Sequence, residues 1–577
     1  MERRADGSIL LRSGYPLGDM PRTIADLFAE RAVSHAGQPF IRQRGADGAW
    51  RGISYGEAWA QASTIARWLL THGASPDHGV VILSGNSAEH ASIMLGCFLA
   101  GVPSAALSQA YSLSSGDLAK LRHCFAKLEP RVVFAQGATY ARAIDMLRQL
   151  DPAIEVVTVD GSEGHAFASL IAVNADFPAE LPRVEPETVA KYLFTSGSTG
   201  IPKAVPQTHR MMAAMIGART GILDGDREVW PPSVVDWMPW SHLSAGNINF
   251  NQNLWAGGTL YIDDGRPIPG QFDETVRNFV ELSPEQFSSA PIAFEMIASA
   301  LEADSGKAKA FFRNLRWMAY GGATLSQEVA ERLQRLAVAA VGRRVPIVTT
   351  YGATEVQGIT SVYWVTDQVG LVGLPLPGVE LKLAPVGDKL EVRARGAGVL
   401  THYHREPALS AAAFDDEGFY CLGDAARLVD PDNPLQGLMF DGRITEDFKL
   451  STGTWVSVGT LRPDLLTALS PLVRDAVIAG QDRSSIGALI WLSEEGRQTT
   501  GVSGVIAERL RRFNQGSGSA RRVRRAVLLD MPPSVPDGEI TEKGYVNQRA
   551  VLARRGEAVR SLYAEPLADG VIEASGG

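Results

Sequence analysis

The sequence predicts an α/β protein with a large N-terminal domain of packed sheets and helices, followed by a small α+β C-terminal domain. Two observations support this prediction. Short apolar runs alternate with amphipathic helical segments through most of the 577 residues, which is typical of helices that cover largely parallel sheets. The pattern changes after residues 440–443, and the roughly 130 residues that follow are enough for a separate domain.

The alternation is clearest early in the chain. Residues 79–84 (GVVILS) form one predicted buried strand, and residues 88–100 have the periodicity of a helix that ends at the Gly-Val-Pro stop signal 101–103. Residues 131–135 form the next predicted strand, with a helix around 139–150 behind it.

The same pattern returns later, with a predicted helix over 326–341 and a strand over 346–351. The predicted strands of the small domain are 475–480, 487–492 and 525–530. We therefore predict domains 1–443 and 444–577. The C-terminal stretch ADGVIEASGG is small and polar, which predicts a loose tail.

Composition excludes several classes of protein. Apolar residues make up 45% of the chain and charged residues 21%, as in an ordinary globular protein, and the net charge of -9 gives no reason to expect nucleic-acid binding. Cys97, Cys124 and Cys421 are too scattered for a disulfide framework or a zinc site. Without a signal peptide or a membrane span in the sequence, we expect a cytoplasmic protein, with a monomer and a homodimer both compatible.

The most informative stretch is 192–205, YLFTSGSTGIPKAV. A predicted strand runs into six consecutive threonine, serine and glycine residues, and Lys203 follows shortly after. The glycines let backbone amides approach a ligand, and the hydroxyl groups can donate hydrogen bonds, so the loop suits a polyphosphate. It is not a Walker A loop, because two residues separate the second glycine from the lysine. A flexible polar turn is the alternative interpretation.

Further motifs follow in a defined order. They are residues 236–242 (DWMPWSH), 319–323 (AYGGA), 350–355 (TYGATE), 418–424 (GFYCLGD) and 441–443 (DGR). Together with the phosphate stretch, they resemble the motifs of the adenylate-forming superfamily, which includes acyl-CoA synthetases, peptide-synthetase adenylation domains and luciferases. The resemblance extends over nearly the whole chain, and it is strongest to sequences classed as feruloyl-CoA synthetases.

The resemblance implies that the protein joins a carboxylic acid to AMP and releases pyrophosphate. Glu355 would bind Mg²⁺, and Thr354 would bond the α-phosphate. Tyr351 would stack on adenine beside the turn 319–323, which would also contact adenine. Asp424 would accept hydrogen bonds from the ribose hydroxyls, with Arg443 close to them. The implied ATP-binding residues are Thr195, Ser196, Gly197, Ser198, Thr199, Gly200, Lys203, Gly321, Gly322, Ala323, Thr350, Tyr351, Gly352, Asp424 and Arg443. Taken singly, Glu355 and Asp424 could each be a structural or surface carboxylate.

Two departures from the family pattern concern the small domain, which in the family is mobile. The usual position of the adenylation lysine holds Glu539, and the resemblance to long-chain enzymes, whose lysine is displaced towards the C-terminus, implies Lys543 instead. An ordinary exposed lysine is the alternative. Thr445 stands at the hinge, where many relatives have Asp or Lys. The resemblance also implies Gly453 as a CoA-binding residue.

The acid is expected to bind beside the 236–242 motif. The implied pocket residues are Trp240, His242, Asn247, Ala290, Ala319 and Gly321. His242 completes the implied catalytic set of Lys543 and Thr354, although a histidine beside a tryptophan is also typical of a packed core. Asn247 either bonds a polar substituent of the acid or bonds the protein backbone.

We interpret the chain as a carboxylate–CoA ligase that uses ATP, Mg²⁺ and coenzyme A to convert ferulate, or a related hydroxycinnamate, to its CoA thioester in the degradation of plant phenolics. The absence of a carrier-protein segment favours free CoA, and an arginine-rich patch over 509–525 either binds its phosphate or forms a solvated face. The alternatives are a fatty-acyl or other aryl-CoA ligase, an adenylation enzyme that loads a carrier protein, and an acyl-adenylate-binding sensor. An oxygenating luciferase ranks last.

Overall fold

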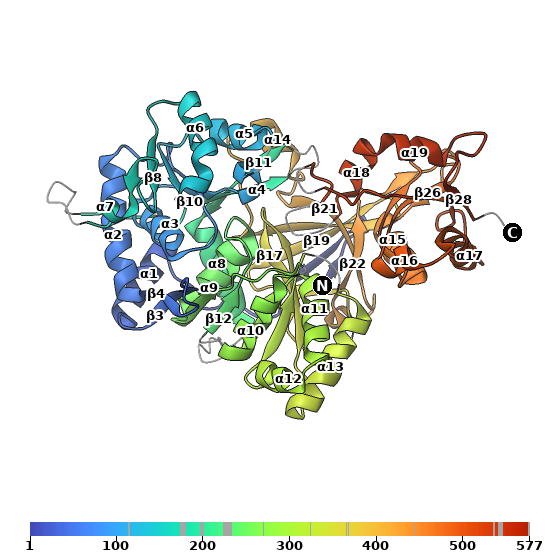
Figure 1. The fold of residues 1–577 in the computed structure, drawn as a ribbon, viewed down its shortest axis with the longest axis horizontal. Helices are drawn as coiled ribbons and strands as arrows, with labels where there is room; N and C mark the ends of the chain where they lie inside the picture. The colour runs from blue at the N-terminus through green and yellow to red at the C-terminus, as the bar shows by residue number, and fades with distance from the viewer. Residues whose placement is uncertain are drawn as a thin grey trace. The chain divides into compact units, whose positions relative to one another are not determined.

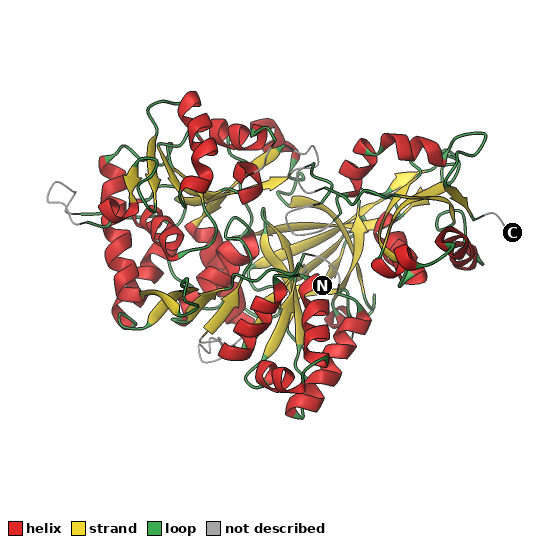
Figure 2. Cartoon of the chain, in the orientation of Figure 1, coloured by secondary structure: helices red, strands yellow, loops and turns green. Residues whose placement is uncertain are grey.

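The computed structural model describes residues 1–113, 116–172, 180–196, 201–222, 233–268, 270–322, 325–364, 366, 368–444, 446–534, 537–540 and 546–574. The chain divides into two compact units (Figure 1). The large unit consists of Met1–Lys382, Arg393–Cys421 and Val429–Leu438, and the small unit of Leu383–Val392, Leu422–Leu428 and Met439–Gly577. Helices cover sheets in both units (Figure 2), which confirms the predicted α/β class.

One sheet of the large unit has the strand order β11-β10-β6-β5-β7-β8-β9. Its strands are β5 (Val80–Leu83), β6 (Ser104–Ala106), β7 (Val132–Ala135), β8 (Glu155–Thr158), β9 (His165–Ala166), β10 (Val189–Ser196) and β11 (Pro202–Thr208). All neighbours pair in parallel except β10 and β11, which form an antiparallel hairpin. The predicted strands at 79–84 and 131–135 are therefore confirmed, as is the largely parallel pairing.

The residues of β5 explain why this sheet is buried on both faces. Val80 and Ile82 belong to one hydrophobic cluster, with α2 (Tyr55–Thr71) and α3 (Ala88–Ala100). Val81 and Leu83 belong to another, with α5 (Ala119–Leu128) and α6 (Ala141–Leu150). Side chains alternate between the two faces of a strand, so an entirely apolar strand requires helices on both sides. Helix α3 ends at Gly101, whose φ of 66° is the left-handed cap that the Gly-Val-Pro signal predicts.

A second sheet of the large unit has the order β12-β13-β3-β4. Its strands are β3 (Pro39–Arg44), β4 (Trp50–Ser54), β12 (Ser233–Asp236) and β13 (Thr259–Ile262), and the nearby helices are α1 (Ile24–Ser34), α8 (His209–Ile222), the π-helix Ser244–Asn249 and α9 (Phe250–Ala256). Tyr55 and Phe40 pack at 4.5 Å between ring centroids, and the Tyr55 hydroxyl donates to Gly258 O. This hydrogen bond ties the start of α2 to the residue that precedes β13.

The rest of the large unit contains the parallel strands β14, β15 and β16, with β17 and β18 added antiparallel. The elements here are α10 (Phe272–Leu282), β14 (Gln286–Ser289), α11 (Pro291–Glu302), α12 (Ser305–Phe312), β15 (Trp317–Tyr320), α13 (Gln327–Val341), β16 (Ile347–Ala353), β17 (Gln357–Val362) and β18 (Leu371–Pro375). Ser326 caps α13 through Val329 N, and Gly342 ends it. The predicted helix over 326–341 and the strand after it are confirmed.

Some strands contribute residues to both units. They are β19 (Val379–Val386), β20 (Lys389–Gly396), β21 (Tyr420–Leu428) and β22 (Leu438–Arg443). The shorter elements are β1 (Glu2–Arg3), β2 (Ile9–Arg12), α4 (Gln109–Leu113), α7 (Phe167–Leu170), α14 (Pro407–Ala412), β23 (Phe448–Lys449), β24 (Trp455–Val456) and α16 (Glu494–Gln498).

The small unit has a mixed sheet in the order β25-β26-β27-β28. Its elements are α15 (Val458–Leu469), β25 (Val473–Ala479), β26 (Ile486–Leu492), α17 (Val502–Asn514), β27 (Val523–Leu528), α18 (Gln548–Arg554), α19 (Gly556–Leu562) and β28 (Val571–Glu573). Ala476 and Ile478 face α15 and α17, whereas Val477 and Ala479 belong to the cluster with α18 and α19. Figure 1 shows the helices on both faces of this sheet.

The prediction of a loose C-terminal tail is wrong for residues 571–574. Residues of β28 pair antiparallel with β27, and Ile572 and Ala574 are buried in the cluster that contains α15 and α17. The apolar Val571 and Ile572 supply the edge strand that a purely compositional reading overlooked. Among the described residues, no helix is both long and apolar enough to cross a membrane. The three cysteines are free thiols.

Two glycines within helices should respond in opposite directions to replacement by alanine. A Cβ atom on Gly96 in α3 would lie 2.6 Å from Ile65 Cγ2 in α2, whereas one on Gly504 in α17 would meet nothing within 4 Å. We expect Gly96→Ala to lower the free energy of unfolding by about 1–3 kcal/mol through overpacking, and Gly504→Ala to raise it by about 0.5–1 kcal/mol through helix propensity. Urea unfolding of both variants measures the difference, and a Gly96→Ala variant at least as stable as the parent would contradict this packing of α2 on α3.

Candidate functional site

The phosphate stretch forms the β10–β11 hairpin. Thr195 pairs with Lys203 and Ser196 with Pro202, so the two strands bring the ends of the glycine-rich loop together. The Lys203 ammonium lies 5.5 Å from the centroid of the Tyr403 ring. Residues 197–200, which carry the predictions for Gly197, Ser198, Thr199 and Gly200, lie outside the described residues, as does the side chain of Ser196.

The carboxylate of Glu355 lies beside this hairpin, and the residue is buried, with only 9% of its surface exposed. Its Oε1 atom accepts a hydrogen bond from the Tyr403 hydroxyl at 3.1 Å and lies 3.5 Å from Thr195 Oγ1. The Tyr403 hydroxyl is also 2.8 Å from that of Tyr420. Burial raises the pKa of Glu355, opposed by the hydrogen bond from Tyr403 and by the charge of Lys203.

These oxygen atoms fit a hard divalent cation. Mg²⁺ prefers carboxylate, hydroxyl, water and phosphate oxygens, and it usually takes only one or two carboxylates from the protein when phosphates supply the rest. The described residues contain no group of three or more His, Cys, Asp or Glu side chains that could hold a metal ion. A buried carboxylate that is destabilised by desolvation gains most from a nearby cation, so Glu355 suits an ion that arrives with a polyphosphate.

The turn predicted to contact adenine lies between β15 and α13. Gly322 has a φ of 85°, which a residue with a side chain rarely adopts. Thr349 Oγ1 donates to Tyr320 O at 3.0 Å, which ties the end of β15 to β16. Gly352 lies so close to the following strand that a Cβ atom would be 1.8 Å from Gln357 O. Ala323 lies outside the described residues.

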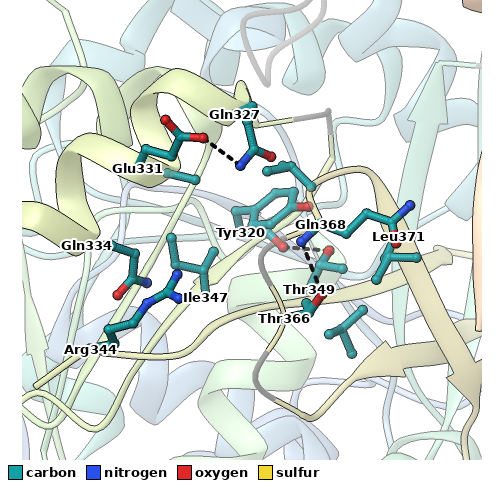
Figure 3. Close-up of a pocket in the computed structure, with 13 residues that line it drawn as sticks. Tyr320, Gln327, Glu331, Gln334, Arg344, Ile347, Thr349, Thr366, Gln368 and Leu371 are labelled. Carbon is teal, nitrogen blue, oxygen red and sulfur yellow. Dashed lines mark hydrogen bonds between the residues drawn. The ribbon is translucent and has the colours of Figure 1, made fainter. Parts of the chain in front are cut away.

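A cavity of about 290 Å³ opens beside this turn. Figure 3 shows Tyr320 and Thr349 among its lining residues, together with polar side chains that include Gln327, Glu331 and Gln368. Gln327 Nε2 donates to Glu331 Oε1 at 3.0 Å at its rim. The cavity adjoins the predicted adenine turn on the side of α13, and it has both polar and apolar walls.

The segment predicted to line the acid pocket is tightly packed. Trp240 is 1% exposed and contacts the ring of His90 edge-on, at 5.0 Å between centroids. Trp237 Nε1 donates to Ser289 Oγ at 3.0 Å, next to the predicted pocket residue Ala290. The half-buried His242 begins the turn that leads into the π-helix, because Gly246 N donates to its carbonyl at 2.8 Å.

Two predicted pocket residues differ in their surroundings. Ala319 is a partly exposed residue of β15, directly before Tyr320 and Gly321. Asn247 is 2% exposed, and its Nδ2 atom donates to Gln207 Oε1 at 2.8 Å. The observed partner of Asn247 is thus a side chain and not the backbone, and contact with an acid stays a prediction.

The predicted ribose contacts belong to the small unit. Arg443 Nε and Asp424 Oδ1 lie 3.4 Å apart, with the arginine side chain 60% exposed. Behind them, the Lys389 ammonium binds the buried Asp447 carboxylate, Asp441 O at 2.8 Å and Ser457 Oγ at 2.8 Å. This anchor lies just after the predicted hinge, Thr445, which is outside the described residues. Gly453 has a φ of 82° in the tight turn between β23 and β24.

The structure explains Glu539, the residue that replaces the usual lysine. Its side chain is 2% exposed and accepts two hydrogen bonds from Arg555, at 2.7 Å from Nε and 2.8 Å from Nη2. A third comes from Ser534 N at 3.0 Å. The bonds from Arg555 hold the pKa of Glu539 below its usual range. Glu539 thus has a structural role, and Lys543 itself lies outside the described residues.

Several residues that complete the site were not singled out from the sequence. Tyr403 and Gln207 contact the Thr354–Glu355 turn from strands and loops distant in the chain. Lys191 is 3% exposed on β10, where its ammonium donates to Gly246 O at 2.6 Å and burial lowers its pKa to about 7. Only the polar residues inside otherwise apolar strands, Lys191 and Gln207, give any sequence signal for these roles.

The chain belongs to the AMP-binding enzyme family. Residues 28–404 match the model of the AMP-binding enzyme, and residues 449–566 match that of the AMP-binding enzyme C-terminal domain. The predicted membership of the adenylate-forming superfamily is therefore confirmed.

Among its relatives, a long-chain-fatty-acid–CoA ligase of Mycobacterium bovis, FadD15, is 25% identical over 91% of this chain and 94% of its own length. A 3-hydroxybenzoate–CoA ligase of Aromatoleum sp. is 25% identical over 75% of this chain and 79% of its own. The solved adenylation domain of the carboxylic acid reductase of Segniliparus rugosus, in complex with AMP and a co-purified carboxylic acid, has a TM-score of 0.74, with 21% identity and 94% of both chains covered. The two chains share a fold.

The carboxylate of Asp236 predicts a pH dependence of stability. It is buried, accepts bonds from Asn249 Nδ2 at 2.7 Å and Met238 N at 2.8 Å, and burial raises its pKa to about 7. Folding therefore takes up a proton between the unfolded pKa of about 4 and about 7, and the stabilisation is lost as pH rises through that window. As the pH rises from 5 to 8, we expect the free energy of unfolding of Asp236→Asn to increase by about 2–3 kcal/mol relative to that of the parent.

Urea unfolding at both pH values measures this change. Asp304→Asn is the control, because hydrogen bonds from Lys307 N and Gly306 N lower the pKa of that exposed carboxyl, which stays ionised throughout the interval. The substitution Asp304→Asn should therefore change the free energy of unfolding by the same amount at pH 5 and at pH 8. A constant difference between the parent and Asp236→Asn would contradict the burial of an ionisable Asp236.

The pair Glu539–Arg555 should be needed for the stability of the small unit. We expect Glu539→Ala to lower the free energy of unfolding by about 3 kcal/mol, because it removes the carboxylate that pairs with a partly buried guanidinium. Glu539→Lys should cost at least as much, since it sets two positive charges together. The neighbouring pair Asp537–Arg554 is exposed, with side chains 43% and 52% accessible, so Asp537→Ala should cost less than about 1 kcal/mol. Equal costs in urea unfolding would refute a structural role for Glu539.

Proposed function

We propose that the protein is an ATP-dependent carboxylate–CoA ligase, with ferulate or a related hydroxycinnamate as its acid. The observation that supports this proposal most directly is the buried Glu355 carboxylate beside the β10–β11 hairpin, where the sequence carries the loop for a polyphosphate. The family supplies the adenylate-forming chemistry. The acid and the acceptor are our proposal, based on the resemblance of the small domain to feruloyl-CoA synthetases.

The first half-reaction forms an acyl-adenylate. A carboxylate oxygen of the acid attacks the α-phosphorus of ATP, a new O–P bond forms, and the bond from that phosphorus to the bridging oxygen breaks, so that pyrophosphate leaves. Lys203 and the hydroxyl of Thr195 would bind the leaving phosphates, and Thr354 would donate to the α-phosphate. Tyr351 and the backbone at Gly321 would hold the adenine.

Glu355 would hold Mg²⁺, which supplies positive charge to the phosphate oxygens as pyrophosphate leaves. The residues around Glu355 keep its carboxylate in place for this role. Tyr403 donates to the carboxylate, and Tyr420 contacts the Tyr403 hydroxyl. Leu400 N donates to Glu355 O at 2.8 Å, which fixes the backbone of the same residue.

The second half-reaction would transfer the acyl group to CoA. The thiol, as thiolate, attacks the acyl carbonyl, a C–S bond forms, and the C–O bond to AMP breaks. Gly453 and the arginine-rich 509–525 region are proposed to contact CoA from the small unit. His242, between the pocket segment and the π-helix, is proposed to line the path of the thiol. Asp424 and Arg443 are proposed to hold the ribose, with Thr445 as the hinge.

A fatty-acyl–CoA ligase is the second candidate. The relative FadD15, named for long-chain fatty acids, matches this chain over nearly its whole length. The relative named for 3-hydroxybenzoate favours an aryl acid. A carrier-loading enzyme or an adenylate-binding sensor would require a different acceptor or no turnover at all.

The deciding measurement is CoA-dependent AMP release with ferulate, p-coumarate, caffeate, benzoate, 3-hydroxybenzoate and fatty acids of increasing length. We expect the hydroxycinnamates to give the highest kcat/KM. We also expect Lys543→Ala to slow adenylation about 100-fold or more, the usual effect of removing one group that stabilises charge in the transition state. Lys307→Ala, at an exposed position in α12, is the control and should have the activity of the parent protein.

Each outcome separates the candidates. Turnover of fatty acids alone would replace the hydroxycinnamate assignment by the fatty-acyl one. Exchange of labelled pyrophosphate into ATP without CoA-dependent product would favour a carrier protein as acceptor, and no exchange would favour a sensor. An active Lys543→Ala variant would show that another residue stabilises the adenylation step.

A further inference from the structure

A buried glutamine lies where three segments of the large unit meet: the β10–β11 hairpin, the π-helix and the Thr354–Glu355 turn. Gln207 is fully buried on β11, four residues after Lys203. It is the cross-strand partner of the buried Lys191 on β10. Cross-strand partners project to the same face of a sheet, so both polar side chains leave the hairpin on one side.

Both side chains reach the π-helix that follows His242. Lys191 Nζ donates to Gly246 O at 2.6 Å, and Asn247 Nδ2 donates to Gln207 Oε1 at 2.8 Å. The π-helix is packed closely here, because a Cβ atom on Gly246 would lie 2.1 Å from Trp240 O. The phosphate hairpin and the predicted wall of the acid pocket are therefore joined at two consecutive residues.

The same glutamine also holds the turn that carries Glu355. Its Nε2 atom donates to Thr354 O at 3.1 Å and to Pro206 O at 3.2 Å, and its Oε1 atom accepts from Gln357 Nε2 as well as from Asn247. A glutamine amide has two donors and an acceptor oxygen with two lone pairs, so every one of these capacities is used. Such a fully bonded amide has one preferred orientation.

The turn needs this support. Gln357 closes the β16–β17 hairpin with a φ of 59°, a left-handed conformation that is unfavourable for a residue with a side chain. The bond from Gln357 to Gln207 offsets part of that cost, so the shape of the Thr354–Glu355 turn depends on the buried amide.

We propose that Gln207 is a positioning residue, which holds the Thr354–Glu355 turn against the phosphate hairpin and the π-helix so that Glu355 and Thr354 meet the metal-bound phosphates of ATP. Gln207 acts on the turn through its hydrogen bond to Thr354 O, the residue before Glu355. This inference rests on the proposed function, because it assigns the metal to Glu355. It predicts that loss of the amide weakens the use of Mg²⁺ more than it weakens binding of the nucleotide.

Gln207→Met tests the inference, because methionine has a similar length and no hydrogen-bonding amide. Isothermal titration with ATP, with and without Mg²⁺ and without acid or CoA, gives the gain in affinity that Mg²⁺ causes. We expect the gain in affinity that Mg²⁺ causes to be about 10-fold smaller in the variant than in the parent. The affinity of the variant for metal-free ATP should stay within about 3-fold of that of the parent. In pyrophosphate exchange, kcat should fall about 30-fold, with the KM of the acid changed by less than about 3-fold.

Gln286→Met is the matched control. Gln286 is also a buried strand glutamine of the large unit, and its amide oxygen accepts from Trp317 Nε1 at 3.2 Å, away from the Thr354 turn. Both variants should lower the melting temperature by a few degrees, whereas only Gln207→Met should change the effect of Mg²⁺. Equal effects of Mg²⁺ in the two variants would overturn the inference.

Asn247→Leu provides a second route if Gln207→Met does not fold. It removes the hydrogen bond from Asn247 to Gln207 and leaves the bond from Gln207 to Thr354. We therefore expect the gain in ATP affinity that Mg²⁺ causes to be about 3-fold smaller than in the parent. Where Gln207→Met does fold, the loss in the double variant should be no larger than in Gln207→Met alone, because the two residues act through one network. Additive losses, or an Asn247→Leu variant with the Mg²⁺ effect of the parent, would overturn the inference. If the parent binds ATP with Mg²⁺ but turns over no acid, the proposed function fails and the positioning role is still tested.

Discussion

The burial of the Glu355 carboxylate is the constraint on which the rest of the site depends. Taking an ionised carboxylate out of water costs several kcal/mol unless hydrogen bonds or opposite charges compensate. Here the compensation comes from Tyr403 and, within the β10–β11 hairpin, from the nearby hydroxyl of Thr195 and the charge of Lys203. The contact with Thr195 lowers this cost and also ties Glu355 to the hairpin, so electrostatics and geometry are satisfied together.

Backbone conformations around Glu355 are constrained in the same way. Gly352 must be glycine because the next strand passes within 1.8 Å of where a Cβ atom would lie. Gln357 adopts a left-handed conformation, and its side chain reaches the amide of Gln207. A turn built from such conformations is rigid only when its neighbours hold it, and Gln207 on β11 and the segment that contains Leu400 and Tyr403 do so. Rigidity of this kind is what a metal-assisted phosphoryl site requires.

The small unit shows how a departure from a family pattern is accommodated. Glu539 occupies the position of a lysine in many relatives, yet it is almost fully buried and holds Arg555 with two hydrogen bonds. The carboxylate and the guanidinium neutralise each other, so the segment before residues 541–545 is anchored by a structural ion pair. Lys389 and Asp447 form a comparable anchor after the predicted hinge.

The sequence by itself determined the fold class, the family and the order of the motifs, because these depend on local periodicity and on short patterns that survive in the linear chain. It also predicted the strands at 79–84 and 131–135 and the helix over 326–341. It missed β28, whose two apolar residues become a strand only beside β27, and it missed Tyr403, Gln207 and Lys191. Only the tertiary structure assigned those roles, because the cost of burying Glu355 and of bending the chain at Gln357 is met by residues far away in sequence. Local sequence patterns do not identify the distant side chains that compensate this cost.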